Sequence, residues 1–319
     1  MTSQSTKRAG ASDDFAIQTF NLTRTFNELV AVDGIELNIR KGELFALLGP
    51  NGAGKTTTIN MLCCLLKPSK GTAHIMGYDI LKQPFKVKEI IGVAPQETAI
   101  SEHLNTQENM NLIGKIHGIN PEELKSRSQQ LLEIMGLSGR VRDQVRNFSG
   151  GMKRRLNIMM ALIHNPEILF LDEPTLGLDP QARRAIWEYI TQLKGEKTIL
   201  LTTHYMDEAD FLADRIGIMD EGKIVALDTS HKLKASMREK NTMIVSARNL
   251  TQKVVDEMRS RYAEVSISDD TMLVTDSQLD FREIVDRLQS AGATVRSAHI
   301  KEPTLEDVFL NLTGKELRE

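Results

Sequence analysis

One short segment constrains this 319-residue chain more than any other feature. It reads Gly49-Pro50-Asn51-Gly52-Ala53-Gly54-Lys55-Thr56 and directly follows an apolar run at residues 44–48. A buried strand, a glycine-rich loop and the start of a helix are the elements of a phosphate-binding loop. The sequence therefore predicts an α/β fold built around a nucleotide site.

The residue types of this loop suit phosphate chemistry. We expect glycine at Gly49, Gly52 and Gly54 because a Cβ would keep the backbone N–H groups away from phosphate oxygens. Lys55 offers an ammonium group to the β- and γ-phosphates, and Thr56 offers a hydroxyl to Mg²⁺. The following helix directs its positive end at the same anion. A glycine-rich turn without a ligand is the alternative, and the strand and helix around the loop disfavour it.

A second apolar run, residues 168–171, ends in the carboxylates of Asp172 and Glu173. At the end of a buried strand, Asp172 suits the orientation of a Mg²⁺ shell through water, and Glu173 suits the activation of an attacking water. Two acids at the solvated end of a strand, with no chemical role, are an equally open interpretation of these residues alone.

A third segment, residues 147–155, places Ser149, Gly150 and Gly151 at the start of an amphipathic helix. Such a helix N-terminus offers free N–H groups and the positive end of the helix dipole to an anion. An ordinary helix cap is the alternative interpretation. Nothing nearby in the sequence supplies an anion for it.

In this order, the three segments resemble the ATP-binding subunit of an ATP-binding-cassette (ABC) transporter, over about residues 15–228. The resemblance implies a P-loop NTPase cassette with a mixed sheet core, an antiparallel β subdomain and a helical subdomain. It also implies ATP as the substrate, Mg²⁺ as the cofactor and hydrolysis of ATP as the reaction. The motifs that it assigns are the Walker A loop at residues 49–57, the Q-loop glutamine Gln96, the signature motif at residues 149–151, the Walker B strand ending in Asp172 and Glu173, the D-loop at residues 176–179 and the switch histidine His204.

The resemblance carries specific roles to these positions. Glu173, His204 and Gln96 are the expected catalytic residues, and Thr56, Gln96 and Asp172 the expected Mg²⁺ ligands. The expected ATP-binding residues are Phe26, Gly49, Pro50, Asn51, Gly52, Ala53, Gly54, Lys55, Thr56, Thr57, Ser149, Gly150, Gly151 and Asp179. The signature motif of one cassette would cap the ATP that a second cassette holds, so that two ATP molecules lie between two subunits.

Two positions depart from the family pattern. Met152 stands where the signature motif usually ends in glutamine, which removes a polar side chain but leaves Ser149 and the helix N–H groups. The aromatic platform for adenine is often a tyrosine, whereas here it is assigned to Phe26, which can stack but has no hydroxyl. An exposed phenylalanine at the end of a strand is the alternative interpretation of Phe26.

Composition agrees with this interpretation. The net charge of −3 indicates no basic surface for nucleic acid, and the run Lys153-Arg154-Arg155 is expected to have a local role in the signature helix. Cys63 and Cys64 are expected to pack inside the helix after the Walker A loop, which fits a reducing cytoplasm. No run of 18 apolar residues occurs. The membrane-spanning part of a transporter is therefore expected on another polypeptide.

The pattern along the chain predicts a disordered tail at residues 1–14, an ABC-type domain at 15–230 and an accessory domain at 242–319. Alternating apolar residues predict a strand over 35–40, and helices are predicted over 106–118 and 121–135. The order of elements in 242–300 predicts a small α+β domain with the ferredoxin-like βαββαβ arrangement, with Phe281, Ile284, Val285 and Leu288 as one apolar helix stripe.

A last helix is predicted to place Leu305, Val308, Phe309 and Leu312 on one face. This tail resembles that of the drug-resistance and lipid-type exporter ATPases, which include the daunorubicin and Nod-factor exporters.

The predicted function is that of an ATPase that pairs with itself or with a similar subunit and drives a separate membrane permease. It would lie on the cytoplasmic face of the membrane and export drugs, lipids or glycolipids. The segment 97–111 after Gln96, together with the helices that follow it, is the predicted surface for the permease. A soluble mechanical ABC ATPase acting on ribosomes or DNA is the alternative, but such proteins usually carry two cassettes, long coiled coils or zinc cysteines. A regulatory module without turnover is a third, which the presence of Glu173 and His204 disfavours.

Overall fold

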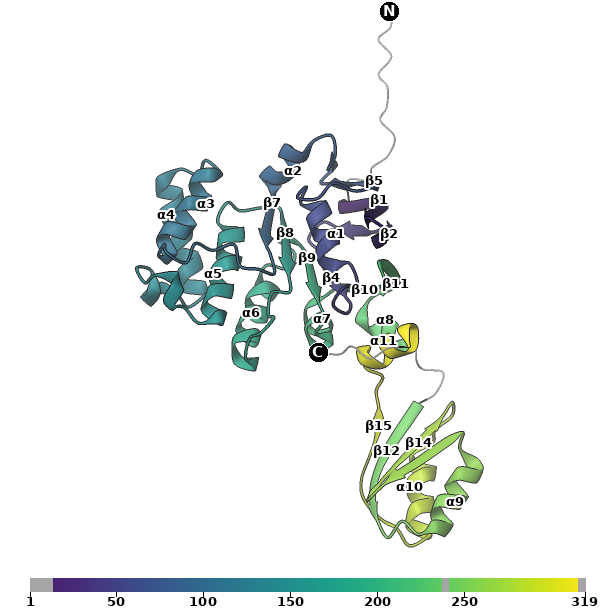
Figure 1. Ribbon diagram of the computed structural model, residues 1–319. Helices are drawn as coiled ribbons and strands as arrows, with labels where there is room; N and C mark the ends of the chain where they lie inside the picture. Colours follow the sequence, from purple (N-terminus) through teal and green to yellow (C-terminus); the bar gives the residue numbers. More distant parts are fainter. Residues whose placement is uncertain (1–13, 237–240, 315–319) are drawn as a thin grey trace, which may run out of the picture. The chain divides into compact units, whose positions relative to one another are not determined.

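The structure is a computed structural model that describes residues 14–236 and 241–314 (Figure 1). The chain divides into two compact units, with the boundary between Thr229 and Ser230. The tail predicted at residues 1–14 lies, except for Asp14, outside the described residues. Among the described residues, no helix has both the length and the apolar character that crossing a bilayer requires.

In the described part of the chain, the first unit consists of two sheets and seven helices. Its strands are β1 (Phe15–Phe26), β2 (Leu29–Ile35), β3 (Asn38–Arg40), β4 (Leu44–Leu48), β5 (Lys70–Ile75), β6 (Tyr78–Asp79), β7 (Ile91–Ala94), β8 (Ile168–Asp172), β9 (Thr198–Thr203), β10 (Arg215–Asp220) and β11 (Lys223–Asp228). Its helices are α1 (Lys55–Leu62), α2 (Pro84–Ile90), α3 (Thr106–Ile116), α4 (Pro121–Ile134), α5 (Gly150–Leu162), α6 (Pro180–Gln192) and α7 (Met206–Leu212), with 3₁₀ turns at Ser138–Arg140 and Val145–Asn147.

The central sheet has the strand order β11-β10-β4-β9-β8-β7, and every neighbouring pair is parallel except β10 with β11. All residues of β4, β8 and β9 are buried. Continuous burial of this kind is typical of parallel strands that are covered on both faces. The register places Leu48 opposite Thr203 and Asp172 opposite Thr202, so the carboxyl ends of these three strands lie together.

A second, antiparallel sheet has the order β2-β1-β5-β6, with β3 paired to β1. The single strand predicted over 35–40 is wrong, because β2 ends at Ile35 and β3 begins at Asn38. The hydroxyl of Thr19 donates to the Ile35 carbonyl and accepts from the Leu37 N–H at 2.7 Å, which interrupts the backbone ladder. The predicted alternation of buried and exposed residues nevertheless holds across the break.

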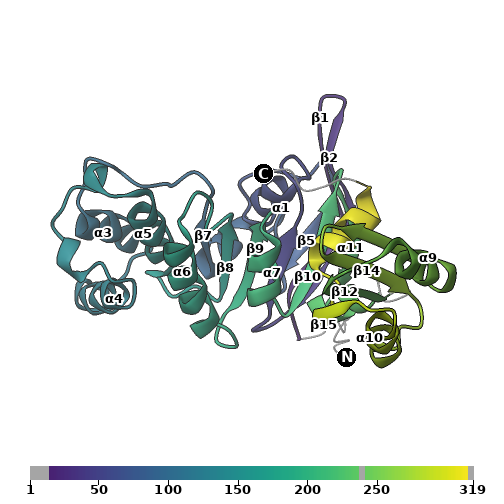
Figure 2. The ribbon, with the colours of Figure 1, turned by 90° about the horizontal axis from the view of Figure 1, so that it is seen from below.

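Helices α3, α4 and α5 gather at one end of the first unit (Figure 2). Side chains fix where they begin: Asn105 forms a capping box with Glu108, Asn120 caps α4, and Ser149 caps α5. Helix α1 ends at Leu62, so the expectation that both cysteines lie inside it is wrong. Cys63 is the C-cap residue, and Cys64 has a left-handed backbone with φ 57°.

The second unit has its own antiparallel sheet and core. Its elements are α8 (Ser230–Ala235), β12 (Asn241–Arg248), α9 (Gln252–Arg261), β13 (Glu264–Ser268), β14 (Thr271–Asp276), α10 (Phe281–Ser290), β15 (Thr294–Lys301) and α11 (Leu305–Thr313). The strand order is β13-β14-β12-β15, which is the order of the predicted ferredoxin-like arrangement. Apolar residues of α9 and α10, such as Met258 and Leu288, pack with Met243 and Val274 of the sheet.

Two details of this unit differ from the sequence prediction. Phe281 and Leu312 were expected on buried helix faces, but their exposed fractions are 44% and 43%. Phe281 is the first residue of α10, before the helix covers the sheet, and Leu312 lies in the last turn of α11. Helix α8, which the prediction left between the two domains, belongs to the second unit and contacts α11.

We predict that Leu288→Ala lowers the unfolding free energy of the second unit by about 2–5 kcal/mol, because it opens a cavity in a fully buried site. The matched control Phe281→Ala, on the same helix but exposed, should change it by less than about 0.5 kcal/mol. Hydrogen exchange of the β12 and β14 amides measures both effects. Equal protection in the two variants would contradict the core assigned here.

Candidate nucleotide site

A cleft of about 470 Å³ lies at the carboxyl ends of the parallel strands. Its walls come from the loop after β4, the end of β1, the start of β2, the segment after β7 and the end of β8. The lining residues are Phe26, Leu29, Ala31, Pro50, Asn51, Gly52, Gly54, Lys55, Thr56, Thr57, Gln96 and Glu173. The fold thus brings together residues from Phe26 to Glu173, which lie far apart in the chain.

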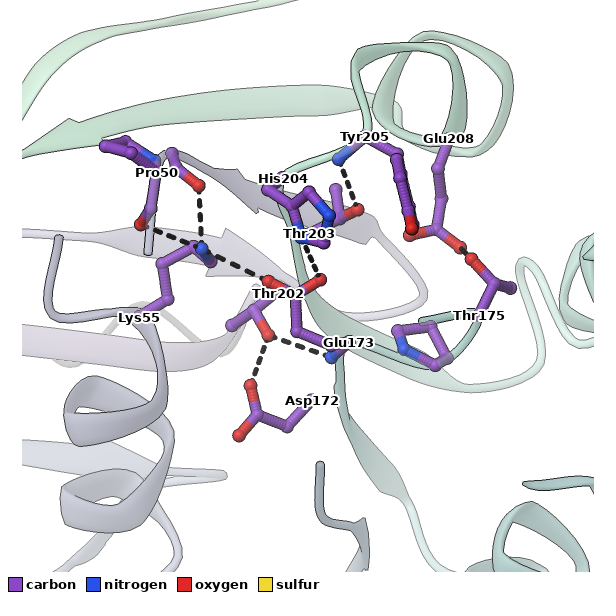
Figure 3. A network of polar contacts seen from close by, with 12 residues as sticks. Pro50, Lys55, Asp172, Glu173, Thr175, Thr202, Thr203, His204, Tyr205 and Glu208 are labelled. Carbon is purple, nitrogen blue, oxygen red and sulfur yellow. Dashed lines mark hydrogen bonds and ion pairs between the residues drawn. The ribbon is translucent and has the colours of Figure 1, made fainter. Parts of the chain in front are cut away.

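Lys55 lies at the centre of this site and is 5% exposed (Figure 3). Its ammonium group donates to the carbonyls of Gly49 at 2.6 Å and Pro50 at 3.1 Å, and it forms an ion pair with Glu173 at 3.1 Å. It is also the first residue of α1, so the positive end of the helix dipole points into the same cleft. The site is therefore arranged to bind a polyanion such as a nucleotide phosphate chain.

The loop glycines serve two different purposes. At Gly52, with φ 84°, a Cβ would meet no atom within 4 Å, so that face of the loop is free for a ligand. At Gly49 a Cβ would lie 2.2 Å from the Met219 carbonyl, and at Gly54 it would lie 2.3 Å from the Ala31 carbonyl. Gly49 and Gly54 are therefore also required by close packing against neighbouring backbone, in addition to the role toward phosphate predicted for the loop glycines.

Glu173 has a strained backbone and a buried carboxylate. Its φ is 50°, in the left-handed region that non-glycine residues rarely occupy. Its N–H donates to both the carbonyl and the hydroxyl oxygen of Thr202, each at 3.1 Å. Strain of this kind costs about 1–3 kcal/mol and persists where the surrounding structure enforces it, which is common at active sites.

The charge of Glu173 is set by two neighbours. Burial raises the pKa of its carboxyl group, but the hydrogen bond with His204 Nδ1 at 2.8 Å and the charge of Lys55 outweigh burial, and the net pKa lies below the usual value. Glu173 is therefore ionised at neutral pH, as a general base must be.

Oxygen donors suited to Mg²⁺ lie beside this carboxylate. The hydroxyl of Thr56 donates to Asp172 Oδ1 at 3.1 Å, and the hydroxyl of Thr202 donates to the same oxygen. Gln96 lines the same cleft. Hydroxyl, carboxylate and amide oxygens are the ligands that a hard divalent cation prefers, so these residues fit the ion.

Comparison with known proteins decides the family. A family model of the ABC transporter matches residues 32–176. The linearmycin resistance ATP-binding protein LnrL of Bacillus subtilis (strain 168) is 38% identical over 310 residues, which are 95% of this chain and all of that protein. The chain belongs to the ABC transporter family. It is an ABC ATPase, as predicted from its motifs.

Two further relatives match over similar lengths. The daunorubicin/doxorubicin resistance ATP-binding protein DrrA of Streptomyces peucetius is 38% identical, over 94% of this chain and 92% of that protein. The Nod factor export ATP-binding protein I of Cupriavidus metallidurans is 36% identical, over 95% of this chain and 99% of that protein. The predicted resemblance to the daunorubicin and Nod-factor exporter ATPases is confirmed.

Solved structures confirm the predicted fold class. The dimeric structure of MJ0796, a bacterial ABC transporter cassette, has a TM-score of 0.63 at 28% identity and covers 67% of this chain and 98% of that one. A dimeric structure of the same cassette in a post-hydrolysis state, bound to ADP and Pi, has a TM-score of 0.62 at 27% identity.

The ABC signature residues lie outside the cleft that holds the Walker A loop. Ser149 is exposed, and its hydroxyl accepts from the Met152 N–H at 3.3 Å as the cap of α5. Asp179 of the D-loop caps α6 in the same way, by accepting from the Ala182 N–H at 2.9 Å. Phe26 lines the cleft and is 41% exposed, and the Arg24 guanidinium lies 4.4 Å from its ring centroid.

Thr202 and Glu208 were not predicted from the sequence. Thr202 contacts both Walker B carboxylate residues, and its position two residues before His204 was the available signal. Glu208 is fully buried and accepts at 2.7 Å from the Thr175 hydroxyl and at 2.9 Å from Trp187 Nε1. Burial raises the pKa of Glu208, although these bonds and Thr203 oppose the shift.

We predict that Thr202→Val lowers the unfolding free energy by about 1–3 kcal/mol, because Asp172 loses a donor and the Glu173 N–H loses an acceptor. It should also lower kcat for ATP hydrolysis, because these two bonds position Asp172 and Glu173, the predicted Mg²⁺ ligand and catalytic residue. The matched control is Thr198→Val at the other end of β9, which removes an acceptor for the Gly42 N–H. Denaturant melts and steady-state ATPase assays separate the two effects. The same kcat loss in both variants would show that Thr202 acts on stability alone.

Proposed function

We propose that this chain is the ATP-hydrolysing subunit of an exporter and works as one of a pair of cassettes attached to a separate membrane-spanning permease. The observation that carries the catalytic part of this proposal is the geometry at Glu173. Its buried, ionised carboxylate lies beside Lys55 and His204 and faces the cleft of the Walker A loop. This arrangement fits activation of a water next to a bound γ-phosphate.

Each residue of the site has a separate task in this proposal. The ring of Phe26 stacks on the adenine, while the backbone N–H groups of the Walker A loop and Lys55 bind the phosphates. Glu173 accepts a proton from the attacking water, and His204 holds that carboxylate in place and contacts the γ-phosphate. Thr56, Asp172 and Gln96 would hold Mg²⁺, which neutralises phosphate charge when bound.

The exposed N-terminus of α5 supports pairing. Gly150 presents its face to open space, and the Ser149 hydroxyl and the first N–H groups of the helix are the kind of donors that bind phosphate. These donors lie outside the cleft of their own cassette, so a second cassette is the natural source of the phosphate. Asp179 lies on the D-loop and is exposed, as a residue that contacts a partner must be.

Export, the permease and the location at the cytoplasmic face of a membrane rest on the relatives. Three of them are named as resistance or export ATP-binding proteins and match this chain over nearly its full length. The alternative of a soluble ATPase acting on ribosomes or DNA is not favoured by these matches. We propose that the permease contacts residues 97–111, which follow Gln96, and the helices after them, and we propose no nucleic acid partner.

We predict that Glu173→Gln keeps ATP binding and lowers kcat by about 10²–10⁴-fold, because the amide keeps the shape of the side chain but cannot accept the proton of water. The matched control is Glu188→Gln, an exposed acid of α6 paired with Arg184, which should leave kcat unchanged. Calorimetry of ATP binding and a steady-state phosphate-release assay measure both properties. Turnover of Glu173→Gln near that of the wild type would remove Glu173 from its role as general base.

We predict that ATP with Mg²⁺ converts the Glu173→Gln protein into a dimer, and that adding Ser149→Arg abolishes the dimer because the long cationic side chain blocks the α5 N-terminus. Ser138→Arg, in the 3₁₀ turn of the same helical region, is the control for added charge. Size exclusion with light scattering gives the mass of each species. A dimer that persists in the Ser149→Arg variant would place the interface elsewhere.

A further inference from the structure

Arg154 is a buried cation in the first unit that no role described above uses. It lies in α5, five positions after Ser149, and is 4% exposed. Among the described residues, no acidic side chain forms an ion pair with it. A buried charge without an ion pair is very unfavourable unless hydrogen bonds satisfy it. The location of those hydrogen bonds therefore indicates what Arg154 holds.

The guanidinium of Arg154 donates to five backbone carbonyls of the ATP site. Nη1 donates to the carbonyl of Pro95 and to that of the next residue, the Q-loop glutamine Gln96, each at 2.9 Å. Nε donates to Pro174 at 2.9 Å, and Nη2 donates to Asp172 at 3.2 Å and to Glu173. The rigid, planar fork of a guanidinium is suited to binding two segments at once.

Burial lowers the pKa of Arg154, and the nearby carboxylates of Asp172, Glu173 and Glu208 oppose that shift. An arginine remains charged in proteins under such conditions. Its hydrogen bonds are therefore charge-assisted and are stronger than bonds between neutral groups.

The contact with Glu173 is of special importance because of its left-handed backbone. The N–H of Glu173 is held by Thr202, and its carbonyl is held by Arg154. The two sides of the strained residue are thus fixed by different elements, β9 and α5. A rotation of α5 about the ATP site would move the Glu173 carbonyl and the Gln96 carbonyl together.

We propose that Arg154 is a positioning residue that fixes the Q-loop and the end of the Walker B strand to the signature helix. Through it, occupation of the α5 N-terminus by the partner's ATP sets the backbone that carries Glu173 and Gln96. This inference rests on the proposed pairing of two cassettes, and it adds a link between the two ATP sites. Lys153 also joins α5 to Glu102, but that pair is on the surface, where ion pairs contribute little.

The test replaces Arg154 by methionine, which keeps much of the side-chain bulk but donates no hydrogen bond. We expect kcat for ATP hydrolysis to fall about 10–100-fold, the order of loss that follows when reacting groups are misplaced by about 1 Å. The KM for ATP should stay within about threefold of the wild-type value, because the Walker A loop is untouched. A kcat within about twofold of wild type would overturn the proposal.

Arg155→Met is the matched control. Arg155 is the next residue of α5, and its guanidinium donates at 2.8 Å to the carbonyl of Met135 at the end of α4, away from the catalytic residues. The Arg155→Met variant should be less stable than the wild type but have the same kcat. Equal kcat losses in the two variants would mean that Arg154 has only a structural role, which would also overturn the proposal.

If Arg154→Met does not fold, Arg154→Lys is used in its place to test the proposal. Lysine keeps the charge, but it has no planar fork with which to bind both the Q-loop and the end of the Walker B strand. A lowered kcat with unchanged KM supports the proposal, and a wild-type kcat contradicts it. The proposed function is judged separately by the wild type and Glu173→Gln. A wild-type protein without ATPase activity would contradict the proposed function. An active wild type whose kcat is unchanged by substitution of Arg154 would contradict only this inference.

Discussion

The left-handed backbone at Glu173 is the constraint on which the catalytic site depends. A non-glycine residue with φ 50° is held there only when its surroundings fix it from several sides. Here the hydroxyl and carbonyl of Thr202 hold the N–H, and Arg154 holds the carbonyl. The carboxylate can then project from the end of the strand toward Lys55 and His204. Buried polar side chains of β9 and α5 thus supply the bonds that hold the strained residue.

The pKa values of two buried carboxyl groups close to this strand end are shifted in opposite directions. The pKa of Glu173 lies below its usual value, because His204 and Lys55 outweigh burial. The pKa of Glu208 lies above its usual value, because burial dominates over its neutral donors Thr175 and Trp187. When the environment separates two carboxyl groups in this way, the ionised one suits the general base. Glu208, by contrast, suits a structural role that ties β9 and the D-loop region to α6 and α7.

The sequence predicted the parts of the site that depend on local pattern. The Walker A loop, the Walker B carboxylates and the helix start at Ser149 are each set by a few adjacent residues, so their local structure could be inferred. Contacts that depend on strand register could not be inferred, because no residue near Asp172 in the sequence indicates that Thr202 lies opposite it. The missed break between β2 and β3 has the same origin, since it results from the distant hydroxyl of Thr19.

The contacts of Arg154 could not be predicted from the sequence. Lys153, Arg154 and Arg155 carry the same charge, so composition alone does not distinguish the middle residue from its neighbours. Helix phase does not distinguish it either, because Lys153, Arg154 and Arg155 all lie three and four positions before buried residues of α5. An arginine on the buried face of an amphipathic helix must find hydrogen-bond acceptors. Which of the three side chains is buried, and where its acceptors lie, depends on the elements that pack against α5.

The second unit has a sheet and a hydrophobic core of its own. Within the described ranges, its sheet shares no strand with the two sheets of the first unit, and α8 extends it past the boundary that composition indicated. Its core is made of its own residues, such as Met243, Val274 and Leu288. Among the described residues, no group of histidine, cysteine or acidic side chains could hold a metal ion. Because this core contains none of the residues that line the nucleotide cleft, changes at Leu288 should affect ATP hydrolysis only through the stability of the second unit.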